Sequence, residues 1–518
     1  MNGRILSQGV GLSAWLAAMV LPSHLPAQEI GHLASLVQPA GDPIGEQAFA
    51  DADGDGDLDL YLAVRKADGT RSLDIHLQHQ GLVFSTGPDQ EIGLSPGVIS
   101  WQVGDYLSDE DSPGAEILML ASRGVYVRTS SGRPLALDTT PLLLDMPSGE
   151  ALPLWEAQAD IDGDGKPELA LVTATGYRLL DTDGTLLGEI TLKPQVERAP
   201  TASGNFLGGV ARPKLSSQEM SDLFVPNEAL GVIARPPALY TYEALPAPVW
   251  NDLNGDGKLD LSYLFEGELR IHVQQADGQF SAEANRRLRL NQDSNDEDDE
   301  LMQLEWVNLG GGASADLMEV RSSTDVLGQQ GAWKVRLHVD PVLSEEFGEP
   351  DAFFKIDTSY MWAYIHDLDG DGGGDLCLSA WDLDLSLLGG LSPEVDHRLL
   401  GFPRTRTGWQ KRASFSESRS YALDDMNSLV SLDSFVLDIT GDGRPDILER
   451  GRSGDLEVRS FVLGTAGVSI SDDVVSTLPM DALLGSVQVE DINGDGVGDF
   501  LISRDGRFEV HLSYRRQQ

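Results

Sequence analysis

Short runs of apolar or alternating apolar and polar residues recur along the chain and predict many β-strands. Residues 58–64 (LDLYLAV), 259–265 (LDLSYLF) and 500–503 (FLIS) are examples. Runs of this length, bounded by segments rich in Gly and Asp, are typical of strands. The residues before such a segment are also strand-like, as in 434–437 (SFVL) and 486–489 (SVQV). Each Gly- and Asp-rich segment is therefore predicted to connect the two strands of a hairpin.

Six of these connections share the nine-residue pattern D-x-[D/N/T]-G-D-G-x-x-[D/E]. They are residues 51–59 (DADGDGDLD), 160–168 (DIDGDGKPE), 252–260 (DLNGDGKLD), 367–375 (DLDGDGGGD), 438–446 (DITGDGRPD) and 491–499 (DINGDGVGD). Ca²⁺ takes about six to eight oxygen ligands, and a tight loop can direct side chains 1, 3 and 5 and the carbonyl of residue 7 at one ion. The acid at position 9 completes this set, and glycine at positions 4 and 6 permits the positive φ that the fold of the loop requires. The pattern predicts up to about six calcium sites.

The predicted ligand residues occupy positions 1, 3, 5, 7 and 9 of each loop, with the backbone carbonyl as the ligand at position 7. In chain order they are Asp51, Asp53, Asp55, Asp57 and Asp59; Asp160, Asp162, Asp164, Lys166 and Glu168; Asp252, Asn254, Asp256, Lys258 and Asp260; Asp367, Asp369, Asp371, Gly373 and Asp375; Asp438, Thr440, Asp442, Arg444 and Asp446; and Asp491, Asn493, Asp495, Val497 and Asp499.

The three loops with Asn254, Thr440 or Asn493 at position 3 keep an oxygen there without its charge. We expect these sites to bind calcium more weakly than the other three. Mg²⁺ fits less well, because it keeps several waters and takes few protein ligands. An EF-hand is excluded, because five of the six loops lack the Glu that an EF-hand needs at position 12.

The alternative is that these loops are ordinary acidic turns, since Asp and Gly are common in turns. A turn, however, does not require an acid at position 9. Carboxylates held this close together would also repel one another without a cation.

Degenerate copies of the loop fill the gaps between the six good ones. Residues 105–116 are acidic but out of frame, residues 204–215 carry an insertion, and residues 308–316 (NLGGGASAD) keep the frame but lack most of the acids. Copies then start at intervals of 45 to 71 residues, which is room for four short strands. Repeated four-stranded units predict an all-β propeller. Nine copies can be counted, and we expect about eight blades, with seven to nine possible.

Two further patterns fit this plan. The last unit ends without a fourth strand, and Ile30–Val37 (IGHLASLV), ahead of the first loop, is expected to supply it and close the ring. The segments LDIHL, LRIHV, VRLHV and FEVHL place four histidines, His76, His272, His338 and His511, at one equivalent strand position. We therefore expect these histidines to be structural.

The repeated DxDGDGxxD loops between two short strands resemble the FG-GAP/VCBS repeats of propellers similar to the N-terminal domain of integrin alpha chains, and of their bacterial relatives. The resemblance covers nearly the whole chain after residue 27. It implies that calcium is held by the side chains at positions 1, 3, 5 and 9 and the carbonyl at position 7 of the six loops. It also implies a role in adhesion or ligand binding, although similar propellers occur in polysaccharide lyases.

Composition narrows the choice of partner and compartment. The net charge is −46, which excludes a binder of the nucleic-acid backbone and disfavours anionic membranes. Residues 1–27 hold Arg4, an apolar stretch at residues 10–21 and a Leu-Pro-Ala step, which predicts a cleaved signal peptide. No later run reaches the length of a membrane span. We expect residues 28–518 to form one propeller that is secreted, periplasmic or on the cell surface, with no membrane insertion.

Long insertions predict where a partner binds. Residues 291–300, 321–331 and 381–397 are expected on the face opposite the calcium loops, where long loops on a rigid scaffold could recognise a protein or a glycan. Five tryptophans lie just before their loops, at positions 101, 155, 250, 306 and 362, and are expected to pack between blades. Two other hypotheses stay open: a secreted carbohydrate-active enzyme such as a lyase, and a structural surface scaffold.

Catalysis finds little support in the sequence. Residues 93–97 match GxSxG, but that motif needs a strand-to-helix turn and here includes Pro96. His76 and His79 lack the Glu of HExxH, and Cys377 is expected to pack as a small apolar residue. We predict no catalytic residues and no cofactor other than calcium.

Overall fold

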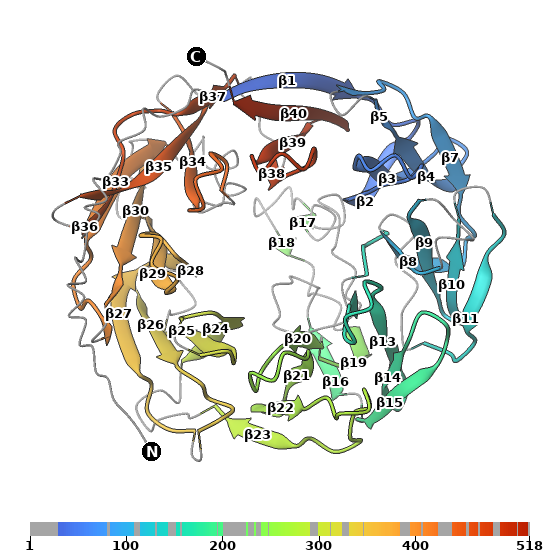
Figure 1. Cartoon of the computed structure of the whole chain (residues 1–518), viewed down its shortest axis with the longest axis horizontal. Helices are drawn as coiled ribbons and strands as arrows, with labels where there is room; N and C mark the ends of the chain where they lie inside the picture. Colours follow the sequence, from blue (N-terminus) through green and yellow to red (C-terminus); the bar gives the residue numbers. More distant parts are fainter. Residues whose placement is uncertain are drawn as a thin grey trace, which may run out of the picture.

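The described part of the computed structural model contains eight antiparallel sheets of four strands, which stand around a common centre as the blades of a propeller (Figure 1). We number the blades in chain order by the loop between their first two strands, and letter the strands A to D from the centre outwards. Blade 1 is β2 (Asp42–Ala50), β3 (Asp59–Arg65), β4 (Arg71–His76) and β7 (Gln90–Gly93). Blade 2 is β8 (Val98–Gly104), β9 (Glu116–Ala121), β10 (Gly124–Arg128) and β11 (Leu135–Asp138). Blade 3 is β12 (Gln158–Ala159), β13 (Glu168–Thr173), β14 (Gly176–Leu180) and β15 (Leu186–Thr191). Blade 4 is β20 (Val249–Asn251), β21 (Asp260–Phe265), β22 (Glu268–His272) and β23 (Arg286–Arg289).

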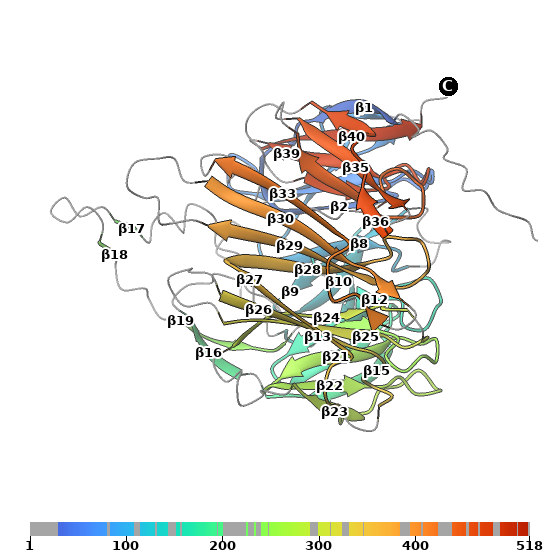
Figure 2. The same cartoon turned by 90° about the vertical axis from the view of Figure 1, so that its left-hand side faces the viewer.

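The second half of the chain forms the other four blades; Figure 2 shows the strands of blade 6 side by side. Blade 5 is β24 (Glu300–Val307), β25 (Asp316–Ser322), β26 (Gly331–His338) and β27 (Ala352–Thr358). Blade 6 is β28 (Tyr360–His366), β29 (Asp375–Leu383), β30 (Glu394–Phe402) and β33 (Phe415–Ala422). Blade 7 is described from strand B outwards, because its A–B loop at residues 438–446 directly precedes β34: strand B is β34 (Asp446–Arg450), strand C is β35 (Leu456–Gly464), and β36 (Gly467–Ile470) and β37 (Ser476–Leu478) both pair with β35. Blade 8 is β38 (Val487–Glu490), β39 (Asp499–Arg504), β40 (Arg507–Arg515) and β1 (Ile30–Val37).

Four two-stranded pairs complete the described secondary structure. They are β5 (Gln78–His79) with β6 (Val83–Phe84), β31 (Arg404–Thr405) with β32 (Gly408–Trp409), β16 (Gln195–Ala199) with β19 (Tyr240–Ala244), and β17 (Phe224–Val225) with β18 (Ile233–Ala234). No helix in the described residues has the length and apolar character of a membrane span.

The structure describes most of the chain from residue 30 onwards. The described residues are 30–79, 83–107, 114–129, 132–142, 152–155, 158–193, 195–199, 224–225, 233–234, 240–246, 248–290, 299–310, 312–323, 331–344, 347–383, 394–405, 408–422, 438–451, 455–464, 467–479, 487–504 and 506–515. The predicted signal peptide at residues 1–27, the degenerate copy at residues 204–215 and the strand at residues 434–437 lie outside them.

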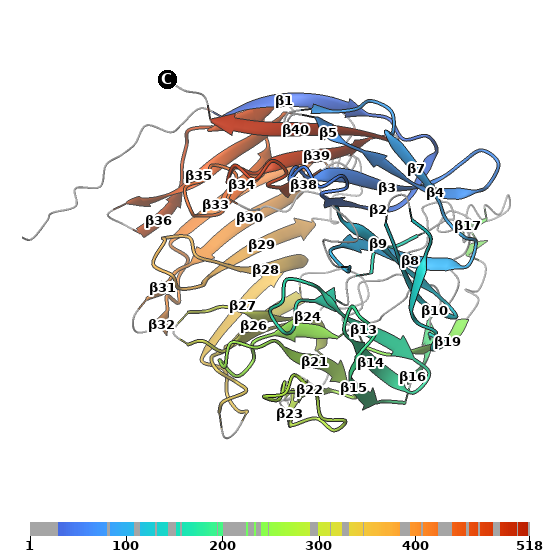
Figure 3. The ribbon, with the colours of Figure 1, turned by 45° about the vertical axis from the view of Figure 1, so that its right-hand side comes forward.

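The two ends of the chain close the ring. The strand β1 pairs antiparallel with β40 over its whole length, from Ile30 opposite Arg515 to Val37 opposite Phe508 (Figure 3). This confirms the prediction that the N-terminal segment supplies the fourth strand of the last blade.

The expectation of about eight blades is confirmed, and the literal count of nine is wrong. The copy counted at residues 204–215 falls between β16 and β19, which pair with each other over residues 195–199 and 240–244. The residues between β16 and β19 are therefore an insertion between blades 3 and 4, and no four-stranded sheet is described there.

The core lies between neighbouring blades. Strand B is enclosed by strands A and C within its sheet and by the adjacent blades on its faces, so it is buried along its length; all six residues of β13 are buried. One cluster joins Leu118 of blade 2, Leu171 of blade 3 and Leu261 of blade 4. Each such leucine contributes about 1.5–3 kcal/mol when fully buried. This burial explains why strand B reads as a continuous apolar run.

The antiparallel order gives each blade two distinct ends. The A–B loops and C–D connections lie on one face, here the A–B face, and the B–C turns and D–A connections lie on the other, the B–C face. The three long insertions connect β23 to β24, β25 to β26, and β29 to β30, so their ends lie on the B–C face as predicted. Their central residues, 291–298, 324–330 and 384–393, are outside the described residues.

Candidate metal centres and a pocket on the opposite face

The six predicted loops share one backbone conformation. Their glycines at positions 4 and 6 all have positive φ, between 68° and 93°. In the first loop the values are 82° for Gly54 and 93° for Gly56. These angles would strain any residue with a Cβ atom, which explains why the sequence has glycine at both positions.

The first carboxylate of each loop organises the turn. In blade 1, Asp51 accepts hydrogen bonds from the N–H groups of Gly54 (2.7 Å) and Gly56 (2.9 Å). Asp160 of blade 3 accepts the same two bonds, from Gly163 (2.8 Å) and Gly165 (3.0 Å). These hydrogen bonds fold the loop around its own carboxylates without the need for a bound ion.

The position 9 carboxylate joins the loop to the far end of strand C. Asp59 is 1% exposed; it accepts the N–H of Ala52 at position 2 (2.7 Å) and the N–H of Gln78 after β4 (2.7 Å). All eight blades keep a buried acid here: Asp59, Glu116, Glu168, Asp260, Asp316, Asp375, Asp446 and Asp499. In six blades this acid bonds both its own loop and the end of strand C, whereas the bonds of Glu116 and Glu168 go to N–H groups of their own loops. Position 9 therefore braces the A–B loop in every blade, besides being a candidate ligand.

Sequence reasoning missed this brace in blades 2 and 5. Glu116 accepts the N–H groups of Tyr106 (2.9 Å) and Leu107 (3.0 Å), and Asp316 accepts that of Leu309 (2.8 Å). The signal was an acid directly before each strand B, including the strands whose loops have lost the acids at positions 1, 3 and 5.

Carboxylate oxygens converge in the three loops that carry an acid at position 3. The groups Asp51, Asp53, Asp59; Asp160, Asp162, Glu168; and Asp367, Asp369, Asp371 each offer oxygens within 4.8 Å of one another. Burial raises the pKa of Asp59 to about 6, and of Glu168 and Asp375 to about 7. Burial and the adjacent Asp55 also raise the pKa of Asp53. Repulsion from the neighbouring carboxylates of each loop adds to these rises in pKa.

One buried carboxylate oxygen, Oε1 of Glu168, tests whether a cation fits the blade 3 loop. Glu168 is fully buried, and its Oε2 accepts the N–H of Ile161 (2.5 Å), but its Oε1 has no hydrogen-bond partner. An unpartnered buried carboxylate oxygen is costly. It belongs to the same group as Asp160 and Asp162, so a divalent cation with oxygen ligands fits this loop.

The loops with asparagine at position 3 keep the same geometry. Asn254 Oδ1 accepts the N–H of Asp256 (2.8 Å), and Asn493 Oδ1 accepts that of Asp495 (3.0 Å). At position 7 the side chains of Lys166 and Lys258 donate to carbonyls outside their own loops, at 2.8 and 2.9 Å. This agrees with the backbone carbonyl, and not the side chain, being the ligand at position 7.

The residues whose types could suggest catalysis are part of the strands and turns of the blades. His76, His272, His338 and His511 are buried, on strand C of four blades. Burial lowers the pKa of the first three. Cys377 is fully buried in β29, and residues 93–97 connect β7 to β8, strand to strand.

Three of the five inner tryptophans, Trp101, Trp155 and Trp306, pack between blades as predicted. Trp101 is fully buried, and Trp155 is 5% exposed. The Nε1 of Trp306 in blade 5 donates to Ser262 Oγ of blade 4 (2.7 Å). These rings join neighbouring blades.

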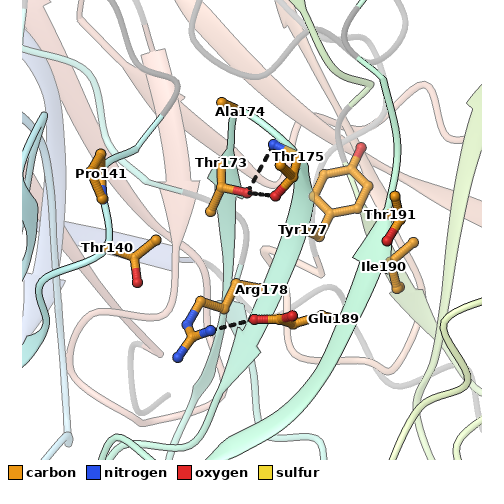
Figure 4. Close-up of a pocket in the computed structure, with 10 residues that line it drawn as sticks. All are labelled: Thr140, Pro141, Thr173, Ala174, Thr175, Tyr177, Arg178, Glu189, Ile190 and Thr191. Carbon is orange, nitrogen blue, oxygen red and sulfur yellow. Dashed lines mark hydrogen bonds and ion pairs between the residues drawn. The ribbon is translucent and has the colours of Figure 1, made fainter.

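A pocket opens on the B–C face between blades 2 and 3 (Figure 4). Its volume is about 270 Å³, and its lining includes the hydroxyls of Thr140, Thr173, Thr175 and Thr191. Thr173 Oγ1 lies 3.2 Å from Thr175 Oγ1.

The side chain of Arg178 forms part of the wall of this pocket. Its Nε donates to Asp138 of blade 2 (2.7 Å), and its Nη1 pairs with Glu189. Burial of Asp138 is outweighed by hydrogen bonds from Thr140 and Arg178, so the pKa of Asp138 lies below its ordinary value. Arg178 is thus paired with two carboxylates, of which Glu189 lines the pocket and Asp138 lies behind the lining. Sequence reasoning did not find the pocket, because its walls come from distant strand ends.

Comparisons with known proteins add little to this picture. No protein-family model and no curated protein sequence matches the chain. The chain is similar to the structure of a proposed 6-phosphogluconolactonase from Bacteroides uniformis ATCC 8492, with 12% identity and a TM-score of 0.30 over 86% of this chain and 96% of that one. It is also similar to the Photorhabdus luminescens Tc holotoxin pore, with 15% identity and a TM-score of 0.23 over 69% of this chain and 16% of that one. Scores this low support no functional inference, and the description of the fold rests on the strand pairing.

Proposed function

We propose that this protein is an exported, calcium-stabilised β-propeller that binds a glycan or protein partner through its B–C face. The observation that carries the calcium part is Glu168, whose buried Oε1 lacks a partner beside Asp160 and Asp162. Bound calcium would supply the missing positive charge and fix the A–B loops. The strong negative charge of the chain is then partly the chemistry of its metal sites.

The pocket between blades 2 and 3 supports binding on the B–C face. Its 270 Å³ is smaller than most sites for whole ligands, so it suits one unit of a larger partner. Hydroxyl groups both donate and accept hydrogen bonds, as a neutral sugar does. The excess carboxylate beside Arg178 disfavours an anionic group. These features favour a neutral glycan over an acidic polysaccharide.

A glycan array with the calcium-loaded protein tests the binding part. We expect neutral glycans to bind and uronate or sialylated ones not to. Thr175→Val, on the exposed B–C turn of the pocket, should weaken binding by about tenfold, the loss of one or two hydrogen bonds. Thr185→Val, on the exposed C–D turn of the same blade, is the matched control and should bind as the wild type. A blank array, or equal losses in both variants, would contradict a glycan site in this pocket.

Export is a separate part of the proposal and rests on residues 1–27. N-terminal sequencing of the protein from the native cell envelope and medium should begin near residue 28. An intact N-terminus on cytoplasmic protein would exclude export.

A further inference from the structure

Three A–B loops lack both a carboxylate and an amide at position 3, and each is contacted by a cationic side chain of the following blade. Position 3 is Leu107 in blade 2, Gly310 in blade 5 and Thr440 in blade 7. The cationic groups bond backbone carbonyls at position 2, 3 or 4 of these loops. They are Lys166 Nζ to Leu107 O (2.8 Å), Arg404 Nη1 to Leu309 O and Gly310 O, and Arg515 Nη2 to Gly441 O (3.0 Å).

Blades 4 and 6 each place one side chain, at the same position after strand C, against the A–B loop of the preceding blade. That loop is acidic in blade 3 and acid-poor in blade 5. Gln274 and Arg404 both follow strand C, and both donate their N–H to the position 9 acid of their own blade, at 2.9 and 2.6 Å. Both side chains then reach back to the position 2 carbonyl of the preceding loop. Gln274 reaches Ile161 O (3.2 Å) in the acidic loop of blade 3, whereas Arg404 reaches Leu309 O in the acid-poor loop of blade 5. A neutral amide faces the acidic loop, and a guanidinium faces the acid-poor loop.

Arg404 is held in this position by its own surroundings. Its guanidinium lies 5.0 Å from the centre of the Trp409 ring, across the β31–β32 hairpin. Stacking of this kind keeps an arginine extended and charged. Blade 6 therefore holds the Arg404 guanidinium against the blade 5 loop through its own contacts.

The blade 7 loop keeps the nine-residue pattern, but its carboxylates already have donors. Asp442 pairs with Arg444 Nη2 (2.8 Å), and Asp446 accepts Ser460 Oγ (2.7 Å). Thr440 Oγ1 lies 3.3 Å from Asp438 Oδ1.

We propose that Lys166, Arg404 and Arg515 act as fixed side-chain cations that replace calcium in blades 2, 5 and 7. This inference rests on the proposed calcium function and reduces the calcium loops from six to five, in blades 1, 3, 4, 6 and 8. The physical reason is repulsion, because an ammonium or guanidinium group held on the loop carbonyls raises the electrostatic cost of adding Ca²⁺ to a loop whose position 3 residue offers neither a carboxylate nor an amide oxygen. Affinity for Ca²⁺ also falls with the number of charged ligands.

Metal counting on matched variants tests the proposal directly. Asp256→Asn and Asp442→Asn change the same position 5 in the blade 4 and blade 7 loops. After dialysis against calcium, elemental analysis should find five ions in the wild type, four in Asp256→Asn and still five in Asp442→Asn. The double variant Arg444→Gln/Arg515→Gln should gain the sixth ion. Six ions in the wild type, with one lost in Asp442→Asn, would overturn the proposal.

Melting in chelator gives a second readout that does not need calcium. Arg515→Gln removes the cation from the blade 7 loop and should lower Tm by about 1–2 °C in EGTA. Arg507→Gln, at the exposed opposite end of the same strand β40, is the control and should leave Tm unchanged. A wild type that binds no calcium would end the proposed function, whereas equal melting of the two arginine variants would end the side-chain cation proposal.

Discussion

The carboxylate of Asp316 accepts the backbone N–H of Leu309 at 2.8 Å, in a loop that has no acid at positions 1, 3 and 5. Its second oxygen accepts the N–H of Asp340 at 2.8 Å. The same brace in blade 1 joins Asp59 to Ala52 and Gln78. The acid at position 9 therefore holds the A–B loop to strand C whether or not the loop can take a metal.

Asp316→Ala should destabilise the protein equally with and without calcium. Truncation leaves two buried N–H groups without acceptors, at a cost of about 1–3 kcal/mol each. Thermal melts in calcium and in EGTA measure the effect, and Asp277→Ala, an exposed turn acid of blade 4, serves as control. A loss seen only in calcium would mean that blade 5 binds the metal.

Chelation should lower the melting temperature strongly. Each occupied site adds about 2.7 kcal/mol when free calcium is a hundredfold above Kd, and several sites act together. Differential scanning calorimetry with calcium and with EGTA measures the shift. Asp162→Asn, which removes one ligand of the blade 3 group, should reduce that shift without abolishing it. An identical melt in both buffers would refute the metal sites.

Calcium binding should weaken as the pH falls from about 7.5 to 5.5. Burial raises the pKa of Glu168 and Asp375 to about 7 and of Asp59 to about 6, so protons compete with the ion in this range. Titration calorimetry in buffers of different ionisation enthalpy should record proton release on binding. An affinity independent of pH across this range would exclude these acids as ligands.

The metal-free protein should show the opposite dependence on pH. These acids have a higher pKa in the folded chain than the unfolded values of about 4. Their contribution to the free energy of unfolding is therefore fully present below pH 4 and is lost as the pH rises through 6 to 7. Melts in EGTA should show this contribution as a fall in Tm between pH 5 and 7.5, and added calcium should cancel it. The variant Asp375→Asn should flatten the fall.

Removal of the closing strand should open the ring. Deletion of residues 1–37 removes β1 and exposes the edge of β40, so we expect Tm to fall by about 5–10 °C and aggregation to increase. Deletion of residues 1–27 keeps Ile30–Val37 and should leave Tm unchanged. Equal melting of the two truncations would show that β1 contributes nothing to stability.

The sequence predicts those parts of the molecule that repeat locally. The loops, their glycines at positions such as 54 and 56, and the β1 strand are encoded in short patterns whose physical demands are specific. The copy at residues 204–215 raised the literal count of repeats to nine, because Gly and short apolar runs also occur in an insertion between two paired strands, β16 and β19.

What the sequence could not predict depends on contacts between blades. Thr140 and Thr191 meet in one pocket only because blades 2 and 3 stand next to each other. Arg404 lies more than ninety residues from Leu309 along the chain, and its role is set by the packing of blade 6 on blade 5. Residue patterns within one repeat carry no information about such pairs.

The pairing of β1 with β40 also joins the first and last described strands of the chain, so blade 8 is the last blade that a growing chain can complete. The first strand of the propeller has no partner until Phe508 to Arg515 have been made and released. Until then the nascent chain carries two unpaired strand edges, at opposite ends of an open arc. A chain that ends before residue 508 lacks the partner of β1, so it leaves blade 8 incomplete, with an unpaired strand edge of the kind that favours aggregation.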